Sequence, residues 1–143
     1  MYYMANEATL IIETELPINM TCANATGIEK GALLKLTDPN TAIINSGYND
    51  VVAGIAAAEK IASDGCTKVS VYRQGIFKVT LSGACVAGDE LILDKAANKV
   101  DALTYKNMVL MSGSNVIGIA LETGADGETI LMELSPRSTL RGL

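Results

Sequence analysis

Apolar and polar residues alternate along several short stretches of the chain, and this period of two constrains its fold most strongly. The alternation is clearest in residues 10–16, 76–81 and 130–134. Successive side chains of a strand point to opposite faces, so this pattern marks strands with one buried face. Turn-forming residues such as Asp38-Pro39-Asn40 and Ala87-Gly88-Asp89 separate these stretches. We therefore expect a mainly β fold, a small barrel or sandwich with little helix.

One alanine-rich segment, residues 51–62, would on its own predict a helix. An internal repeat favours strands instead, because Gly54-Ile55-Ala56 leads to Asp64-Gly65 and Gly118-Ile119-Ala120 leads to Asp126-Gly127. The second copy is too short for a stable helix and contains a further glycine. Both copies are therefore predicted to be strand, tight Asp-Gly turn and strand, and a short helical turn also fits the first copy.

A second pair of matching segments extends the repeat. Residues 31–36 resemble residues 88–93, and an Asn-containing turn follows each of them. We therefore expect a pseudo-twofold repeat of two related units, about 28–81 and 86–134. A chain of this size should close both units around one core, as a single β domain over residues 21–134.

The two ends of the chain differ in charge. Residues 1–29 contain four Glu and no Lys or Arg, whereas residues 135–143 contain Arg137 and Arg141 and no acidic residue. The last nine residues lack periodicity and are expected to be a C-terminal tail outside the core. Residues 1–20 are expected to form an N-terminal arm that precedes the repeat.

Composition excludes several classes of function. The chain has no His, which removes the commonest general base and most zinc and haem sites. Its net charge of −5 disfavours nucleic acid as a partner, and no apolar run reaches the length of a membrane helix. We expect no cofactor, metal, small-molecule substrate or membrane partner. Three cysteines are far apart and are interpreted as free thiols: Cys22, Cys66 and Cys85.

Three further features of the sequence are candidate sites. Asp64 and Asp126 could form a catalytic carboxylate pair, but each precedes a glycine and fits a structural turn better, with Gly65 and Gly127. Glu59 and Glu122 occupy matching places in the repeat and could bind a cation or a basic partner, or lie at solvated strand ends. The segment Asp94-Lys95-Ala96 is similar to the modified tip of lipoyl carrier domains, in which an exposed Lys is modified.

A set of motifs taken in order resembles a known family. The matching segments are 13–17 (ETELP), 27–36 (GIEKGALLKL), 53–57 (AGIAA), 64–67 (DGCT), 72–77 (YRQGIF), 87–89 (AGD), 118–122 (GIALE) and 126–127 (DG). Together they cover about residues 9–134, and they resemble the small decoration, or cement, proteins of tailed-virus capsids. This resemblance implies a β-rich fold, homotrimers on the capsid exterior and no catalytic activity.

The resemblance predicts a structural protein of the virion, made in the host cytoplasm, that binds the major capsid protein and stabilises contacts between its subunits. A lipoyl-type carrier modified at Lys95 and a non-viral β interaction module remain as alternatives.

The capsid-binding element is predicted to be the arm, which would add as an edge strand to a shell subunit. Its alternation presents an apolar face and an acidic one. The residues concerned are Leu10, Ile12, Glu13, Thr14, Glu15 and Leu16. The alternative is that the arm pairs with its own barrel.

Overall fold

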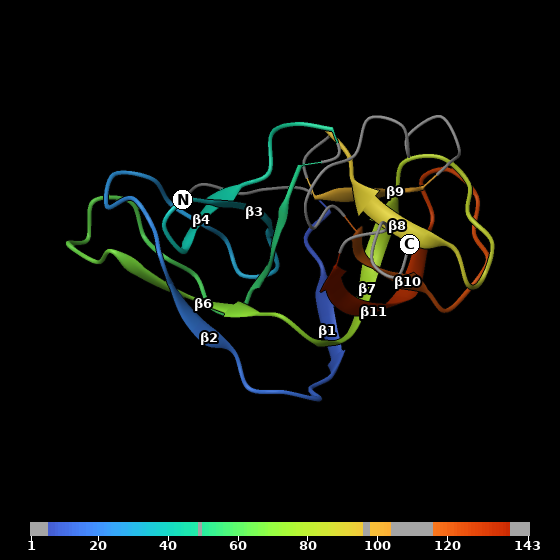
Figure 1. Cartoon of the computed structure of the whole chain (residues 1–143), viewed down its shortest axis with the longest axis horizontal. Helices are drawn as coiled ribbons and strands as arrows, with labels where there is room; N and C mark the ends of the chain where they lie inside the picture. The colour runs from blue at the N-terminus through green and yellow to red at the C-terminus, as the bar shows by residue number, and fades with distance from the viewer. Residues whose placement is uncertain (1–5, 49, 96–97, 104–115, 138–143) are drawn as a thin grey trace.

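Two five-stranded β-barrels lie side by side in the computed structural model (Figure 1). The structure describes residues 6–48, 50–95, 98–103 and 116–137. These residues contain strands, turns and no helix, which confirms the mainly β fold. The alanine-rich segment forms a strand and the start of a loop, so the helical turn that also fitted it is absent.

The N-terminal barrel closes in the order β2-β4-β3-β5-β6. Its strands are β2 (Ile18–Thr21), β3 (Leu33–Thr37), β4 (Thr41–Ile44), β5 (Val52–Ala56) and β6 (Lys68–Tyr72). The C-terminal barrel closes in the order β7-β11-β10-β8-β9, because β9 pairs in parallel with β7. Its strands are β7 (Gly75–Leu81), β8 (Glu90–Leu93), β9 (Lys99–Ala102), β10 (Val116–Ala120) and β11 (Thr129–Arg137). A further strand, β1 (Thr9–Ile12), pairs with β7 outside this ring.

The internal repeat is confirmed, since the two barrels have the same topology and the same backbone contacts. Gly31 N–H donates to the Ala56 carbonyl at 2.9 Å, and Gly88 N–H donates to the Ala120 carbonyl at 2.7 Å. Two isolated bridges also correspond, one in each barrel: Ile28 with Lys60 and Cys85 with Gly124. These contacts fix which residue of one barrel matches which residue of the other.

The boundary between the units differs from the expected one. The barrels run over residues 18–72 and 75–137, so strand 75–81 opens the second barrel rather than ending the first. Alternation alone says nothing about which barrel a strand joins. The last strand also runs to Arg137, into the expected tail, and residues 138–143 lie outside the described residues.

Each barrel has its own hydrophobic core, in place of the single core expected. The N-terminal core includes Met20 and Leu34, and the C-terminal core includes Phe77 and Ile117. The C-terminal core extends into the first barrel, where it includes Leu33, Val52, Ile55 and Tyr72. The two barrels therefore share one packed interface. Two of the three free cysteines, Cys22 and Cys85, are buried, and Cys66 is exposed.

The repeated glycine of the G-I-A motif has a steric cause. A Cβ atom on Gly54 would lie 2.1 Å from the Tyr72 carbonyl oxygen, and one on Gly118 would lie 2.2 Å from the Glu133 carbonyl oxygen. Both contacts are with the neighbouring strand of the same barrel. Only glycine allows the two backbones to approach this closely.

Candidate functional site

The arm contributes a strand to its own C-terminal barrel. In the antiparallel pair of β1 and β7, Leu10 lies opposite Phe77 and Ile12 lies opposite Ile76. Leu10 is half-buried and packs against the C-terminal core. Strand β1 ends the sheet, and among the described residues no strand pairs with its outer edge.

The arm is also bonded to the end of β6, directly before the linker between the barrels, residues 73–74. The Tyr72 hydroxyl donates a hydrogen bond to Glu13 Oε2 at 2.7 Å, and this bond, followed by burial, raises the pKa of Tyr72. Arg73 Nη1 donates to the carbonyl oxygens of Val52 and Ala53, at 3.2 and 2.8 Å. Burial lowers the pKa of the Arg73 guanidinium, and the nearby Glu15 carboxylate opposes that shift. Glu13 therefore connects the arm to the last residue of β6, and the charge of the exposed Glu15 acts on Arg73 of the linker.

A third contact joins the arm to the N-terminal barrel, where Ala8 N–H donates to the Gly31 carbonyl at 2.9 Å. Residues 18–20 of the expected arm belong to β2, which closes that barrel. The arm was expected to lie outside the repeat units. Instead, β1 pairs with β7 of its own chain, and the end of the arm forms part of β2. The alternating pattern could not distinguish these cases, because pairing within the chain and pairing with a partner require the same side chains.

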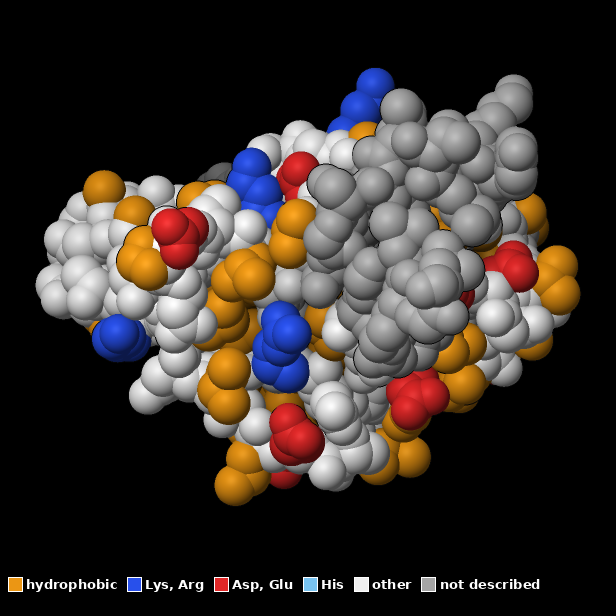
Figure 2. Space-filling view, in the orientation of Figure 1, with side chains coloured by type: hydrophobic (Ala, Val, Ile, Leu, Met, Phe, Trp, Pro, Cys, Tyr) orange, Lys and Arg blue, Asp and Glu red, His pale blue; other side chains and the backbone are white. Residues whose placement is uncertain are grey.

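The arm nevertheless exposes much apolar surface. The exposed fractions are 47% for Ile11, 54% for Ile12, 74% for Leu16 and 45% for Ile18, and we call these four residues the arm patch. Thr14 and Glu15 beside them are also exposed. Figure 2 shows hydrophobic side chains along the lower edge of the molecule, where Figure 1 places the connection from β1 to β2.

The two aspartates of the Asp-Gly motifs stabilise loops in different barrels. Asp64 Oδ1 accepts a hydrogen bond from Cys66 N–H at 2.8 Å, which together with Lys60 lowers the pKa of Asp64. Asp126 Oδ1 accepts one from Gly83 N–H at 2.8 Å. The glycines that follow, Gly65 and Gly127, have φ of +84° and +85°. The loops are longer than the two-residue hairpins expected, since they connect strands that end at Ala56 and Ala120 and resume at Lys68 and Thr129.

The other candidate residues are separated. The paired bridges align Glu122 with Ala58, so Glu122 and Glu59 are not equivalent in the repeat. Glu122 Oε1 accepts a hydrogen bond from Leu131 N–H at 2.8 Å, a role within its own loop. Lys95 is exposed after a nearly buried Asp94, and the third residue of that motif lies outside the described residues.

One feature was not predicted from the sequence. A groove of about 630 Å³ lies on the N-terminal barrel, between residues 25–29 and 59–62. Lys60 beside it is only 4% exposed, and its Nζ donates to the backbone carbonyls of Asn24 and Ile61 and lies 3.4 Å from Asp64 Oδ1. Nothing in the sequence around Lys60 marks this residue as buried. The matching position in the second barrel is Gly124, which has no side chain to bury.

Neither a metal centre nor a membrane helix is found in the described part of the chain. No group of three or more Cys, Asp or Glu there could hold a metal ion. No helix of the described ranges is long and apolar enough to span a membrane.

Comparison with known proteins is consistent with a phage structural role. The crystal structure of the head fiber gp8.5 N base in bacteriophage phi29 has a similar fold, with a TM-score of 0.53 and 15% sequence identity over 86% of this chain and 97% of that chain. No curated protein matches the sequence. The family model described as phage cement protein matches residues 12–134. Since this match covers most of the chain, the protein belongs to the phage cement protein family.

Proposed function

We propose that the protein is a capsid decoration protein that binds the outer surface of the assembled capsid and stabilises contacts between major capsid protein subunits. Family membership makes it a capsid-associated structural protein of the virion and points away from catalysis. The protein would bind the capsid exterior, and it would do so through its N-terminal arm. It would be made in the host cytoplasm and added to the capsid exterior.

The observation that carries the proposal is the arm patch. Four aliphatic side chains that are nearly half or more exposed stand close together in the sequence around β1 and β2. Large apolar side chains left exposed in one short segment favour a macromolecular partner. The patch borders the outer edge of β1, which pairs with no strand of the described ranges. A strand of a capsid subunit could add there through backbone hydrogen bonds. Leu10 contributes instead by anchoring β1 to its barrel.

Charge on the arm would affect the rate of binding. Glu15 is exposed beside the patch, whereas Glu13 is already bonded to Tyr72. We therefore expect Glu15→Lys to slow association with a basic capsid rim, an effect that added salt should reduce. Glu13→Lys would also break the hydrogen bond with Tyr72 and is a poorer probe.

A homotrimer is part of the proposal. Ile43 of β4 and Leu121, which follows β10, are also well exposed, so apolar surface remains beyond the arm patch. Closed rings of identical subunits cover such surface efficiently. Analytical ultracentrifugation of the free protein and subunit counting on capsids test the state. If neither the free protein nor the capsid-bound protein consists of three copies, this part of the proposal is wrong.

Co-sedimentation with undecorated capsids tests the function. The double variant Ile12→Glu, Leu16→Glu should lose at least about tenfold in affinity, since each side chain would place a charge in an apolar contact. Val86→Glu is the matched control, because Val86 is 61% exposed and lies on the other barrel. Equal binding by both variants would reject the arm as the grip, and absence of binding by the unmodified protein would reject capsid decoration. Intact-mass analysis of the same material tests the alternative of a modified Lys95.

A further inference from the structure

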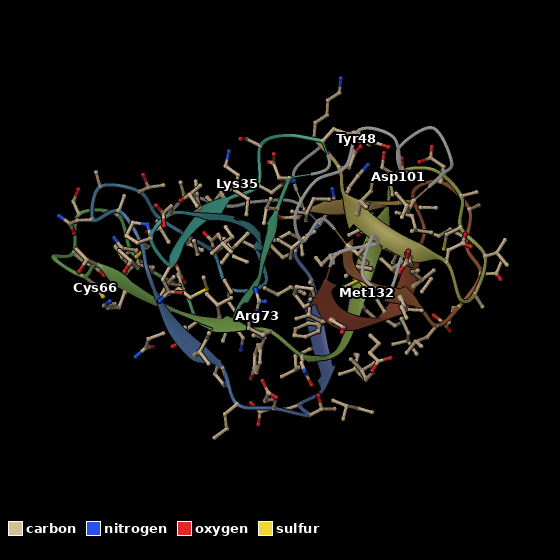
Figure 3. All side chains as sticks on the ribbon, viewed as in Figure 1. Lys35, Tyr48, Cys66, Arg73, Asp101 and Met132 are labelled. Carbon is tan, nitrogen blue, oxygen red and sulfur yellow. The ribbon has the colours of Figure 1, made fainter. Side chains whose placement is uncertain are left out.

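The groove on the N-terminal barrel has an apolar interior. It lies between residues 25–29, which precede β3, and residues 59–62, which follow β5, with Ile44 of β4 as part of its wall. Ile28 within it is buried, and Ile61 at its margin is 64% exposed. Figure 3 places Cys66, which belongs to the same loop as residues 59–62, at the end of the molecule away from the C-terminal barrel.

The margin of this groove is acidic. Glu29 and Glu59 both line it, and neither forms an ion pair with a described Lys or Arg. Both carboxylates lie close enough to Glu7 to affect it. The pKa of Glu7 is raised mainly by burial and further by the negative charges of Glu29 and Glu59. Lys60 also lines the groove, but its side chain is buried and directed at the Asn24 carbonyl and Asp64. The groove therefore presents apolar side chains with uncompensated negative charge.

The duplicated barrel provides an internal control. Counting from the matched bridges, Glu29 corresponds to Val86, Glu59 to Thr123 and Ile61 to Ala125. The second barrel builds the same corner without the two acids or the large apolar side chain. These residues are therefore not required by the fold, which leaves a binding role for them.

We propose that this groove binds the C-terminal tail, residues 138–143, of a second copy of the chain. The tail carries Leu140, Arg141 and Leu143 and no acidic residue. Two leucines flanking a cation complement an apolar groove with an acidic margin. The tail follows Arg137, whose backbone pairs with Val116 in the C-terminal barrel, whereas the groove belongs to the N-terminal barrel.

A contact between the tail of one copy and the groove of the next is heterologous. Such contacts close into rings when the rotation between subunits allows it. This contact would hold the proposed trimer together, and it does not depend on capsid binding. Loss of capsid binding with this contact intact would reject the proposed function alone.

The direct test uses a chain that ends at Arg137 and a fluorescent peptide of residues 138–143. We expect saturable binding by fluorescence anisotropy and a loss of at least about tenfold in the variant Glu29→Lys, Glu59→Lys. Glu133→Lys, an exposed charge reversal on β11, is the matched control and should bind normally. A peptide with Arg141→Glu should recover binding to the doubly substituted groove. Thermal melting of each variant shows that it is folded.

Sedimentation then tests the second copy. The full chain should sediment as an oligomer and the chain ending at Arg137 as a monomer. Absence of saturable peptide binding, or binding that ignores the groove substitutions, would overturn the site. An unchanged molecular mass after removal of the tail would overturn its role between copies.

Discussion

The Tyr72 hydroxyl lies 2.7 Å from Glu13 Oε2 and donates a hydrogen bond to it, joining the arm to the strand that ends the N-terminal barrel. The Tyr72 ring also contacts Phe77 edge to face, with centroids 5.6 Å apart. One side chain thus connects the arm with the first strand of the C-terminal barrel. The arm would then contribute to the fixed arrangement of the two barrels as well as to binding.

Replacing Tyr72 with Phe should isolate the hydrogen bond, since the ring contact with Phe77 is retained. We expect a loss of about 1 kcal/mol in the free energy of unfolding, measured by urea denaturation. A double-mutant cycle with Glu13→Gln supplies the control. Strictly additive effects of the two substitutions would show that the bond contributes nothing.

Lys60 should be essential to the loop that borders the groove. Lys60→Met removes the donors to the Asn24 and Ile61 carbonyls and leaves Asp64 without its cation. The two carbonyls and the carboxylate would lose their shared buried partner. We therefore expect the free energy of unfolding, measured by chemical denaturation, to fall by about 2–3 kcal/mol. The exposed Lys30 is the matched control. Equal stability of Lys60→Met and Lys30→Met would contradict the assigned role.

The two repeat glycines should be equally intolerant of a side chain. Gly54→Ala and Gly118→Ala each place a methyl group about 2 Å from a carbonyl oxygen of the adjacent strand. We expect each to cost about 3 kcal/mol or more, or to prevent folding. A Cβ atom at Gly65, whose φ is +84°, would meet nothing within 4 Å, so Gly65→Ala should cost only about 1 kcal/mol. Thermal melting of the three variants measures their stabilities. A Gly65→Ala variant as unstable as the other two would contradict the steric explanation.

Asp101 in β9 should make stability depend on pH. Burial raises its pKa, and the charges of Asp94 and Asp126 act in the same direction, while hydrogen bonds from Ala102 N–H and the Tyr48 hydroxyl oppose them. A raised pKa means that the folded state holds this proton more tightly. The resulting stabilisation is complete below the unfolded-state pKa of about 4 and is lost as pH rises through the folded-state pKa.

Asp101→Asn tests this dependence, because Asn removes the charge and keeps an Oδ1 atom that can accept the hydrogen bond from Ala102 N–H. The variant should be more stable than the unmodified protein at pH 7, and the difference should shrink toward pH 3.5. Glu133→Gln, at an exposed position, should change stability little at either pH. A variant that is less stable at pH 7 would contradict the expected sign.

Local patterns predicted the strands and the repeat well. Alternation at residues 76–81 and 130–134 corresponds to β7 and β11, and the paired glycines at 54 and 118 mark equivalent strands. These features depend on neighbouring residues, so they are visible in the sequence. Membership of β7 in the second barrel depends on pairing with β9 and β11, which no local pattern records.

The candidate site was predicted less completely for the same reason. The arm was found from its alternation, but its pairing with β7 was not, because Leu10 and Ile12 suit any neighbouring strand. The groove arises where two distant loops meet, so neither loop reveals it. Comparison of the repeat halves was the available signal, since Glu29 and Val86 occupy the same place with different chemistry.

A difference map between decorated and undecorated capsids, obtained by electron cryomicroscopy, tests the central claim most directly. The account predicts added density on the outer surface at junctions between capsid subunits, into which the two barrels fit with residues 11–18 against the shell. Density with the arm turned away from the shell would contradict the assigned grip. A map without added density on the outer surface would contradict capsid decoration itself.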